Sequence, residues 1–260
     1  MDSNEGSNEG SNQSRDQSRD VSPDMTRDET GDQSGSKSRG DDFAAIRAEI
    51  RRVGCSLFER GYVHSTAGNI SVRLPGDQGF LITPTDACLG FLEPEALAWV
   101  ELDGTQRSGA RASKTLALHR RIYQADADAH CVIHTHSTHL VAASLGGAWI
   151  ANELLPPITP YYVMKVGHVP LIPYQRPGDP RSADAVEAAI IEAQRAGHPI
   201  RAVMLERLGP NVWHGSPSAA MATLEELEET ARLWILSGRS AAPLSPAQIE
   251  ELRTGFGARW

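Results

Sequence analysis

Residues 130–139, HCVIHTHSTH, place four histidines around a short apolar run. The apolar residues 131–133 are typical of the end of a buried strand. If the strand continues to residue 136, alternation of side chains puts His134 and His136 on the same face. Two imidazoles on one face can reach a single metal ion, and histidine is the commonest ligand for zinc-like metals. Such a site needs three or four ligands, so a second reading stays open, in which the histidines are only the polar end of a strand.

The sequence on either side of this strand predicts interleaved helices and strands. Apolar residues at steps of three and four from Phe43 to Leu57 predict a helix that Gly61 ends. NISVRL and GFLIT flank the turn PGDQG and predict a β-hairpin, and LAWVEL, VPLIPY, RAVMLE and NVWHG are further predicted strands. The remaining helices are expected from Ser113 as N-cap to Ala125, from Ser137 onward, over 183–196 and over 217–236. This order indicates an α/β or α+β layer fold.

Composition bounds the class of protein. At 260 residues and 40% hydrophobic content, the chain can bury one substantial core. It has no run of 18 apolar residues and no apolar leader, so neither a membrane span nor a signal peptide is expected. The three cysteines, Cys55, Cys88 and Cys131, have no C-x-x-C spacing and suit a reducing compartment. A cytoplasmic location is therefore expected.

The first 42 residues have a different composition from the rest. They contain the tandem repeats SNEGSNEGSN and SRDQSRD and very few large apolar side chains, so we expect a disordered acidic tail over 1–42 and a folded domain over 43–260. The tail carries a net charge of −6, which leaves −2 for the domain and no basic stripe for nucleic acid. A solubilising extension is the simpler role for the tail, and a partner-binding arm is the alternative.

Two turns carry small residues and hydroxyls next to predicted strands. STAGNIS, residues 65–71, precedes one strand, and TPTDA, residues 83–87, follows another. Loops of this kind can cradle a phosphate through backbone N–H groups and hydroxyls. Each turn taken alone can equally be an ordinary connection.

Several stretches together resemble one family. STAGNISVR, LITPTDACLGFL, SKTLALH, HTHSTH, PYYVMKVGHVPLIPYQRPGD and EELEETARL resemble, in order and separation, the class II aldolase/adducin superfamily, and most closely its 3-oxo-tetronate 4-phosphate decarboxylase branch. The resemblance covers residues 43–237. It implies an α/β fold, with three αβα layers around a largely antiparallel central sheet. It also implies a homotetramer with active sites between neighbouring subunits.

The resemblance assigns roles to particular residues. In the family, an H-x-H pair binds zinc or another divalent metal, and His134 and His136 match that pair. A phosphorylated substrate is held by positions that fall here on Asn69, Thr85, Ser113 and Lys114.

Two family positions carry different residues in this chain. The position of the acid/base glutamate is Thr115, which does not titrate near neutral pH. The position of the third metal-binding histidine is Leu208, which cannot bind a cation. Glu206 lies two residues earlier on the same strand, His214 lies across the next hairpin, and His139 lies one turn beyond His136. Glu206 and His214 are the candidate substitute ligands.

The resemblance implies a metal-dependent decarboxylase of a phosphorylated 3-oxo sugar acid, with zinc as the expected metal. Loss of CO₂ from a 3-oxo acid needs an electron sink at the ketone, which a divalent metal supplies as a Lewis acid. Because no base has to remove a carbon-bound proton first, loss of the glutamate damages a decarboxylase less than an aldolase. The alternatives are a non-catalytic member with the same fold and an iron-dependent oxidative decarboxylase.

Overall fold

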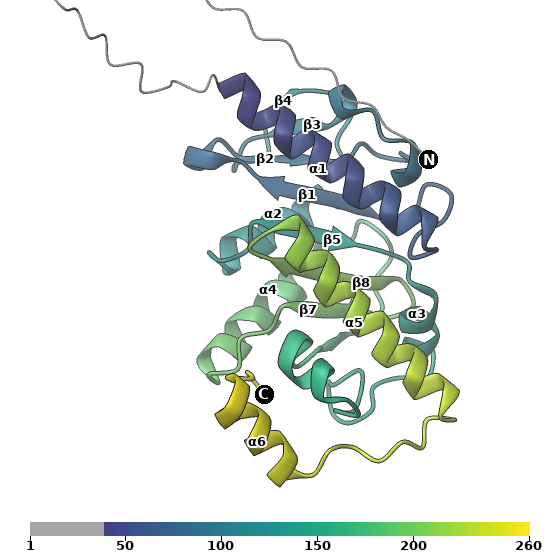
Figure 1. Cartoon of the computed structure of the whole chain (residues 1–260). Helices are drawn as coiled ribbons and strands as arrows, with labels where there is room; N and C mark the ends of the chain where they lie inside the picture. Colours follow the sequence, from purple (N-terminus) through teal and green to yellow (C-terminus); the bar gives the residue numbers. More distant parts are fainter. Residues whose placement is uncertain (1–38) are drawn as a thin grey trace, which may run out of the picture. The chain divides into compact units, whose positions relative to one another are not determined.

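The computed structural model describes residues 39–260 (Figure 1). The helices are α1 (Arg39–Glu59), α2 (Leu116–Ala125), α3 (Thr138–Ser144), α4 (Pro180–Arg195), α5 (Pro217–Leu236) and α6 (Pro246–Phe256). The strands are β1 (Asn69–Arg73), β2 (Phe80–Ile82), β3 (Ala98–Val100), β4 (Gln106–Ser108), β5 (Cys131–His134), β6 (Leu171–Ile172), β7 (Ala202–Leu205) and β8 (Gly209–His214). The predicted tail lies outside the described residues except for 39–42, which begin α1.

The strands form one sheet in the order β4-β3-β2-β1-β5-β8-β7-β6. All neighbours are antiparallel except β6 and β7, which are parallel. The histidine-rich strand β5 lies near the middle, paired with β1 on one side and β8 on the other. A strand paired on both sides is held by two ladders of backbone hydrogen bonds, so the end of β5 is a rigid place for functional side chains.

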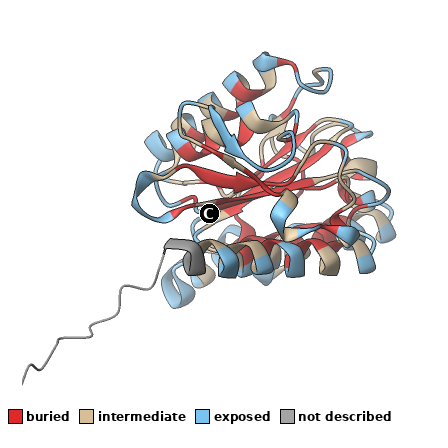
Figure 2. Cartoon of the chain, turned by 90° about the horizontal axis from the view of Figure 1, so that it is seen from above, coloured by how far each residue is buried: buried red, intermediate tan, exposed pale blue. Residues whose placement is uncertain are grey.

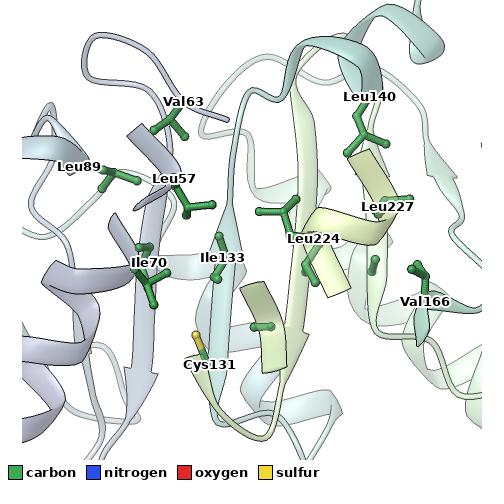
Figure 3. Packing of buried hydrophobic residues seen from close by; sticks show 14 of the residues in the cluster. Leu57, Val63, Ile70, Leu89, Cys131, Ile133, Leu140, Val166, Leu224 and Leu227 are labelled. Atoms are coloured by element: carbon green, nitrogen blue, oxygen red, sulfur yellow. The ribbon is translucent and has the colours of Figure 1, made fainter. Parts of the chain in front are cut away.

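Helices cover both faces of the sheet. On β5, Cys131 and Ile133 belong to the cluster packed by α1, α3 and α5, whereas Val132 faces the cluster packed by α2 and α4. Figure 3 shows Ile133 beside Ile70 of β1 and Leu224 of α5. The helices bury the sides that face the sheet and expose the others, as Figure 2 shows. No helix among residues 39–260 is long and apolar enough to cross a membrane.

The predicted hairpin and the main helices are confirmed, with α5 at its predicted bounds. Two local predictions are wrong. The helix expected from Ser113 begins at Leu116 with Thr115 at the N-cap, because the Ser113 hydroxyl accepts the Thr115 N–H at 3.3 Å in a turn before the helix. Strand β5 ends at His134 and does not reach His136. Strand β4, α6 and a π-helical turn over Tyr162–Val166 were not predicted.

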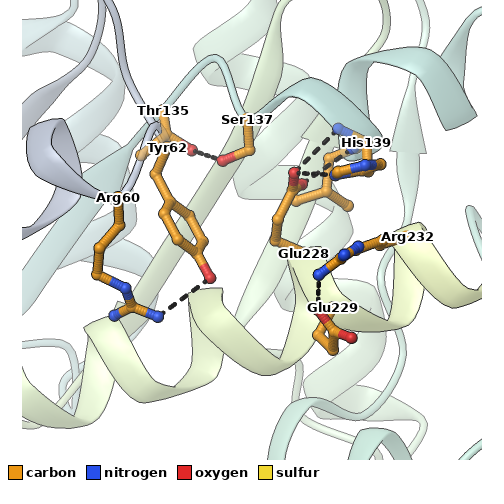
Figure 4. Close-up of polar contacts among 9 residues, drawn as sticks. Arg60, Tyr62, Thr135, Ser137, His139, Glu228, Glu229 and Arg232 are labelled. Carbon is orange, nitrogen blue, oxygen red and sulfur yellow. Dashed lines mark hydrogen bonds and ion pairs between the residues drawn. The ribbon is translucent and has the colours of Figure 1, made fainter.

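Helix α3 follows the histidines, and a side chain from α5 caps its N-terminus. Ser137, at the N-cap, makes no capping hydrogen bond, and its hydroxyl bonds Thr135 at 2.6 Å instead. Glu228 accepts the backbone N–H groups of His139 at 2.9 Å and Leu140 at 3.0 Å (Figure 4). A carboxylate at this end also matches the helix dipole, so α5 fixes where the chain turns after His136.

Candidate active site

A cavity of about 240 Å³ opens where β1 and β5 meet the N-terminal ends of α2 and α4. It brings together eight residues that the sequence singled out from five separate stretches. These are Asn69, Thr85, Ser113, Lys114, Thr115, His134, His136 and Leu208. A more open hollow of about 570 Å³ elsewhere contains His214 and none of these eight. The smaller cavity is therefore the candidate site.

His134 and His136 lie next to each other although only the first is in the strand. Their ring centroids are 5.1 Å apart. His134 Nδ1 lies 2.8 Å from the Pro210 carbonyl, which can only accept, so Nδ1 carries the proton and Nε2 keeps a free lone pair. Burial, followed by the neighbouring His136, lowers the pKa of His134 to about 4. Burial and His64 also lower the pKa of His136, so both rings are neutral at pH 7.

His64 is a third imidazole near the pair, and the sequence analysis missed it. Its ring centroid lies 6.3 Å from that of His136, and its side chain is exposed. Its position directly before the STAGN turn was the available signal. Within residues 39–260, no group of three or more His, Cys, Asp or Glu side chains is arranged to hold a metal ion. Proximity to His136 therefore does not complete a ligand set.

Leu208 lies in a tight turn pressed against the end of β5. Arg207 has φ of 64° and Gly209 has φ of 149°. A Cβ at Gly209 would collide with the Thr135 carbonyl oxygen and come within 3.4 Å of His134 Cε1. The turn thus passes beside the histidine pair, and the side chain that it sends to the cavity is apolar. Leu208 packs with the apolar cluster under α2 and α4.

Neither candidate substitute ligand lies with the histidine pair. Glu206 accepts the Tyr174 N–H at 3.0 Å and lies 3.6 Å from the guanidinium of Arg207. His214 pairs in register with Cys131, whereas His134 pairs with Asn211, so His214 is at the opposite end of β5. His139 is also engaged elsewhere, since its Nδ1 lies 2.8 Å from Glu228.

Thr115, at the family glutamate position, belongs to a buried hydrogen-bond network. Its hydroxyl donates to Asn69 Oδ1 at 2.9 Å, and His119 Nε2 lies 2.6 Å from the same oxygen. Since that oxygen only accepts, His119 donates from Nε2 and accepts from the Ser71 hydroxyl at Nδ1, 2.7 Å away. Ser71 in turn accepts from Tyr123, also at 2.7 Å. Because Asn69 Oδ1 accepts both of these hydrogen bonds, the NH₂ group of Asn69 is the part of the side chain that remains for a ligand.

His119 is a second residue that the sequence analysis missed. It is fully buried, and burial together with His134 lowers its pKa to about 3, so it stays neutral. Its step of four from Thr115 was a signal that it shares a helix face with the site.

The other end of the cavity carries hydroxyls and cations. Thr85 and Ser113 line it from neighbouring loops, and Lys114 pairs with Asp86 at 3.3 Å. Both partners of this pair are largely exposed, at 65% and 69% of the side chain, and such pairs contribute little to stability. Arg176, which the sequence analysis did not select, lines the same cavity. This end of the site can take an anion.

Comparisons with known proteins agree with one another. A family profile described as "Class II Aldolase and Adducin N-terminal domain" matches residues 48–235. A protein of Cupriavidus necator named 3-oxo-tetronate 4-phosphate decarboxylase is 55% identical over 83% of this chain and 97% of its own length. One of the same name from Escherichia coli K12 is 39% identical over 82% and 99%.

Solved structures show the same fold. The crystal structure of YgbL from Escherichia coli, titled a putative aldolase/epimerase/decarboxylase, has a TM-score of 0.74 at 39% identity and covers 81% of this chain and 99% of its own. An L-fuculose 1-phosphate aldolase has a TM-score of 0.70 at 21% identity, over 82% and 97%, and supports the fold alone. The architecture is the α/β class II aldolase fold, with a mixed and mostly antiparallel sheet. The chain belongs to the class II aldolase and adducin family.

Proposed function

We propose that this chain, an enzyme of the carbon–carbon lyase class, decarboxylates a phosphorylated 3-oxo sugar acid such as 3-oxo-tetronate 4-phosphate. Two relatives named for this activity support the proposal, since their similarity extends over most of the chain. The observation that carries it is one cavity with an anion-binding end, made by Thr85, Ser113 and Lys114, and a histidine pair at the other.

The anion-binding end holds the phosphate. Lys114 exchanges its exposed contact with Asp86 for the phosphate oxygens, where a charge-assisted hydrogen bond is stronger. The Thr85 hydroxyl donates to a remaining oxygen, and the Ser113 hydroxyl donates to another after turning away from Thr115 Oγ1, which lies 3.0 Å from it in the structure. Asn69 lies between this end and His134, its cross-strand neighbour, and its NH₂ group donates to the substrate. Anchoring the phosphate orients the acid group toward the histidines.

The reaction breaks the bond between the carboxylate carbon and C2. The electron pair moves to the 3-oxo oxygen as CO₂ leaves, and C2 then takes one proton, which gives a three-carbon ketose phosphate. Hydrogen-bond donors such as the Asn69 amide stabilise the negative charge on that oxygen. The neutral His134 has a free lone pair on Nε2, which accepts a hydrogen bond from a substrate hydroxyl. The Thr115 proton is committed to Asn69, so water delivers the proton to C2.

Class II aldolases are divalent-metal enzymes, typically of zinc, which acts as a Lewis acid. The donor set of this cavity does not fit that metal, since two imidazoles face it and Leu208 occupies the third position. The steps above therefore use only hydrogen bonds from the chain itself.

Assembly, layering and location are further parts of the proposal. Family membership supports a homotetramer with sites between subunits, which sedimentation equilibrium would test. Helices on both faces support three αβα layers. Three free cysteines support a reducing, cytoplasmic location, and the near-neutral charge of residues 43–260 argues against a nucleic-acid partner.

The test measures CO₂ release from 3-oxo-tetronate 4-phosphate and from the same acid without phosphate. We expect release from the phosphorylated acid only. Lys114→Ala should raise its KM by about 10- to 100-fold, the equivalent of one hydrogen bond to a charged group. Lys165→Ala, a lysine outside this cavity, is the matched control and should leave KM unchanged. Binding of the phosphorylated acid without CO₂ release would instead support the non-catalytic reading.

A further inference from the structure

The histidine pair presents two metal donors where the family uses three, and the third position is filled by an apolar side chain. We infer that this chain has lost the divalent-metal site of its family and that its cavity binds the substrate without a metal ion. The second part of this statement rests on the proposed function, whereas the first concerns the ligand set alone.

The histidine pair offers two free donor atoms. His134 offers Nε2, since its Nδ1 donates to the Pro210 carbonyl, and His136 offers one ring nitrogen beside it. Zinc sites in proteins use at least three side-chain ligands. Leu208 occupies the remaining side, held there by a turn whose backbone touches Thr135. A cation bound by the pair would face a hydrocarbon group on that side.

Neither acidic side chain of the cavity forms a metal-binding group with the histidine pair within residues 39–260. Asp86 pairs with Lys114 at 3.3 Å. Asp179 caps α4 through the Arg181 N–H and pairs with the Arg181 side chain at 2.8 Å. These contacts lower the pKa of Asp179. In the structure without substrate, both carboxylates that line the cavity are thus paired with cations of the chain.

Disturbing only the residues that support metal ligands costs about 10- to 100-fold in metal affinity. Replacing a ligand by leucine removes the coordinate bond itself and should cost at least as much. Thr115 adds no charge in place of the family glutamate, since its hydroxyl is bonded to Asn69. The cavity therefore has lost both the ligand and the anionic group near it.

The experiment compares zinc binding by the full chain and three variants, each purified without added metal. They are Leu208→His, the double variant Leu208→His/His136→Ala, and the control Leu233→His, which places a histidine on the exposed side of α5. Zinc content is measured by mass spectrometry, and Zn²⁺ affinity is measured by competition with a chromophoric chelator.

We expect no bound zinc in the wild type and about one zinc per chain in Leu208→His, at an affinity at least ~100-fold higher. The double variant should lose this gain, and Leu233→His should match the wild type. One tightly bound zinc per wild-type chain would overturn the inference, whether His64 or a second copy of the chain supplied the third ligand. So would equal affinities in the wild type and Leu208→His.

A second measurement separates this inference from the proposed function. CO₂ release is followed before and after treatment of the wild type with a strong chelator. CO₂ release that is unchanged by the chelator supports both the metal-free site and the proposed decarboxylase function. Release abolished by the chelator and restored by Zn²⁺ would overturn the metal-free reading while leaving the decarboxylase intact. Absence of release from any phosphorylated 3-oxo acid, with no zinc bound, would overturn the function and leave the loss of the metal site standing.

Discussion

His119 is a buried neutral imidazole whose position decides how Asn69 faces the cavity. It donates to Asn69 Oδ1 at 2.6 Å and is itself oriented by the Ser71 hydroxyl at 2.7 Å. An asparagine amide can turn over, and its direction is set by the hydrogen bonds around it. A ring locked between Asn69 and Ser71 keeps the NH₂ group available to the substrate. His119 is thus a positioning residue that touches no ligand.

Replacing His119 should weaken substrate binding. In His119→Leu, Asn69 loses the donor that orients it, so we expect the KM for the phosphorylated acid to rise about 5- to 10-fold, the value of one neutral hydrogen bond. His119→Gln, which can still donate to Asn69, should restore most of this loss. Equal KM values for both variants would show that His119 only fills space.

Asn211 is a buried polar residue whose side chain has no hydrogen-bond partner within residues 39–260. It lies beside His134 across the β5–β8 ladder and is 0% exposed. Burial of an unsatisfied polar group costs folding free energy. This feature is invisible in the sequence, where the residue is one member of a predicted strand.

Asn211→Leu should therefore increase stability. We expect the free energy of unfolding to rise by about 1–3 kcal/mol, the desolvation cost of the amide. Denaturant unfolding measures it, with Asn152→Leu at an exposed site as the control, for which a change within about 0.5 kcal/mol is expected. A loss of stability in Asn211→Leu would mean that the amide has a partner, such as an ordered water.

Among the elements, α3 and α5 are coupled by one side chain that the periodic pattern cannot reveal. Glu228 lies on the stripe of α5 that packs inward, at 9% exposure, yet it has a polar side chain. Its two oxygens accept the first free N–H groups of α3, 88 and 89 residues earlier in the chain. The turn that follows His136 is therefore fixed by a distant helix.

Glu228→Ala should destabilise the protein and loosen the start of α3. We expect the free energy of unfolding to fall by about 1.5–3 kcal/mol, since hydrogen bonds to a charged group are lost. The amides of His139 and Leu140 should exchange faster with solvent. Glu229→Ala is the matched control, because its exposed pair with Arg232 at 3.5 Å is worth little. Equal losses in both variants would contradict the capping role.

Sequence patterns predicted the elements whose apolar residues repeat, and the failures have physical causes. The stripe from Phe43 to Leu57 gave α1 because Ile50, Val53 and Leu57 all reach the core. Helix α6 was not predicted because its apolar stripe, Ile249, Leu252 and Phe256, is short and none of its residues is buried, although Ser245 and Gln248 form a capping box. Strand β4 is exposed along its length and gives no alternating pattern.

At the scale of the whole molecule, the candidate site is assembled from segments that only the fold brings together. The eight cavity residues were predicted because the resemblance names their motifs, and the sheet register then places Asn69 opposite His134. Sequence spacing did not predict His119, Asn211 or Arg176, whose roles depend on which loops meet. Nor could it show that Glu206 and His214 lie away from the pair.

Buried neutral histidines should make the whole fold sensitive to mild acid. The pKa values of His119 and His134 fall from 6.5 to about 3 and about 4 in the folded state. Below pH 6.5 these two histidines bind protons in the unfolded chain but not in the folded chain, so the free energy of unfolding falls as the pH drops. Each group contributes a loss of about 1.4 kcal/mol per pH unit between its two pKa values.

Denaturant unfolding between pH 7 and 5 measures this loss. His119→Gln removes one of the two groups and should flatten the slope in that window, whatever its stability at pH 7. A wild-type stability that stays constant down to pH 5 would contradict the neutral, buried state of these rings.

Helix α6, yellow in Figure 1, is less buried than the other helices. It buries none of its own residues, and aromatic contacts that follow it secure it. Trp260 stacks on His168 at 4.2 Å and meets Tyr162 edge-on at 5.6 Å. A segment with few buried contacts can open at a smaller free energy than is needed to unfold the sheet. We therefore expect α6 to open locally without unfolding of the sheet, so that its amide protons exchange with solvent before those of β5.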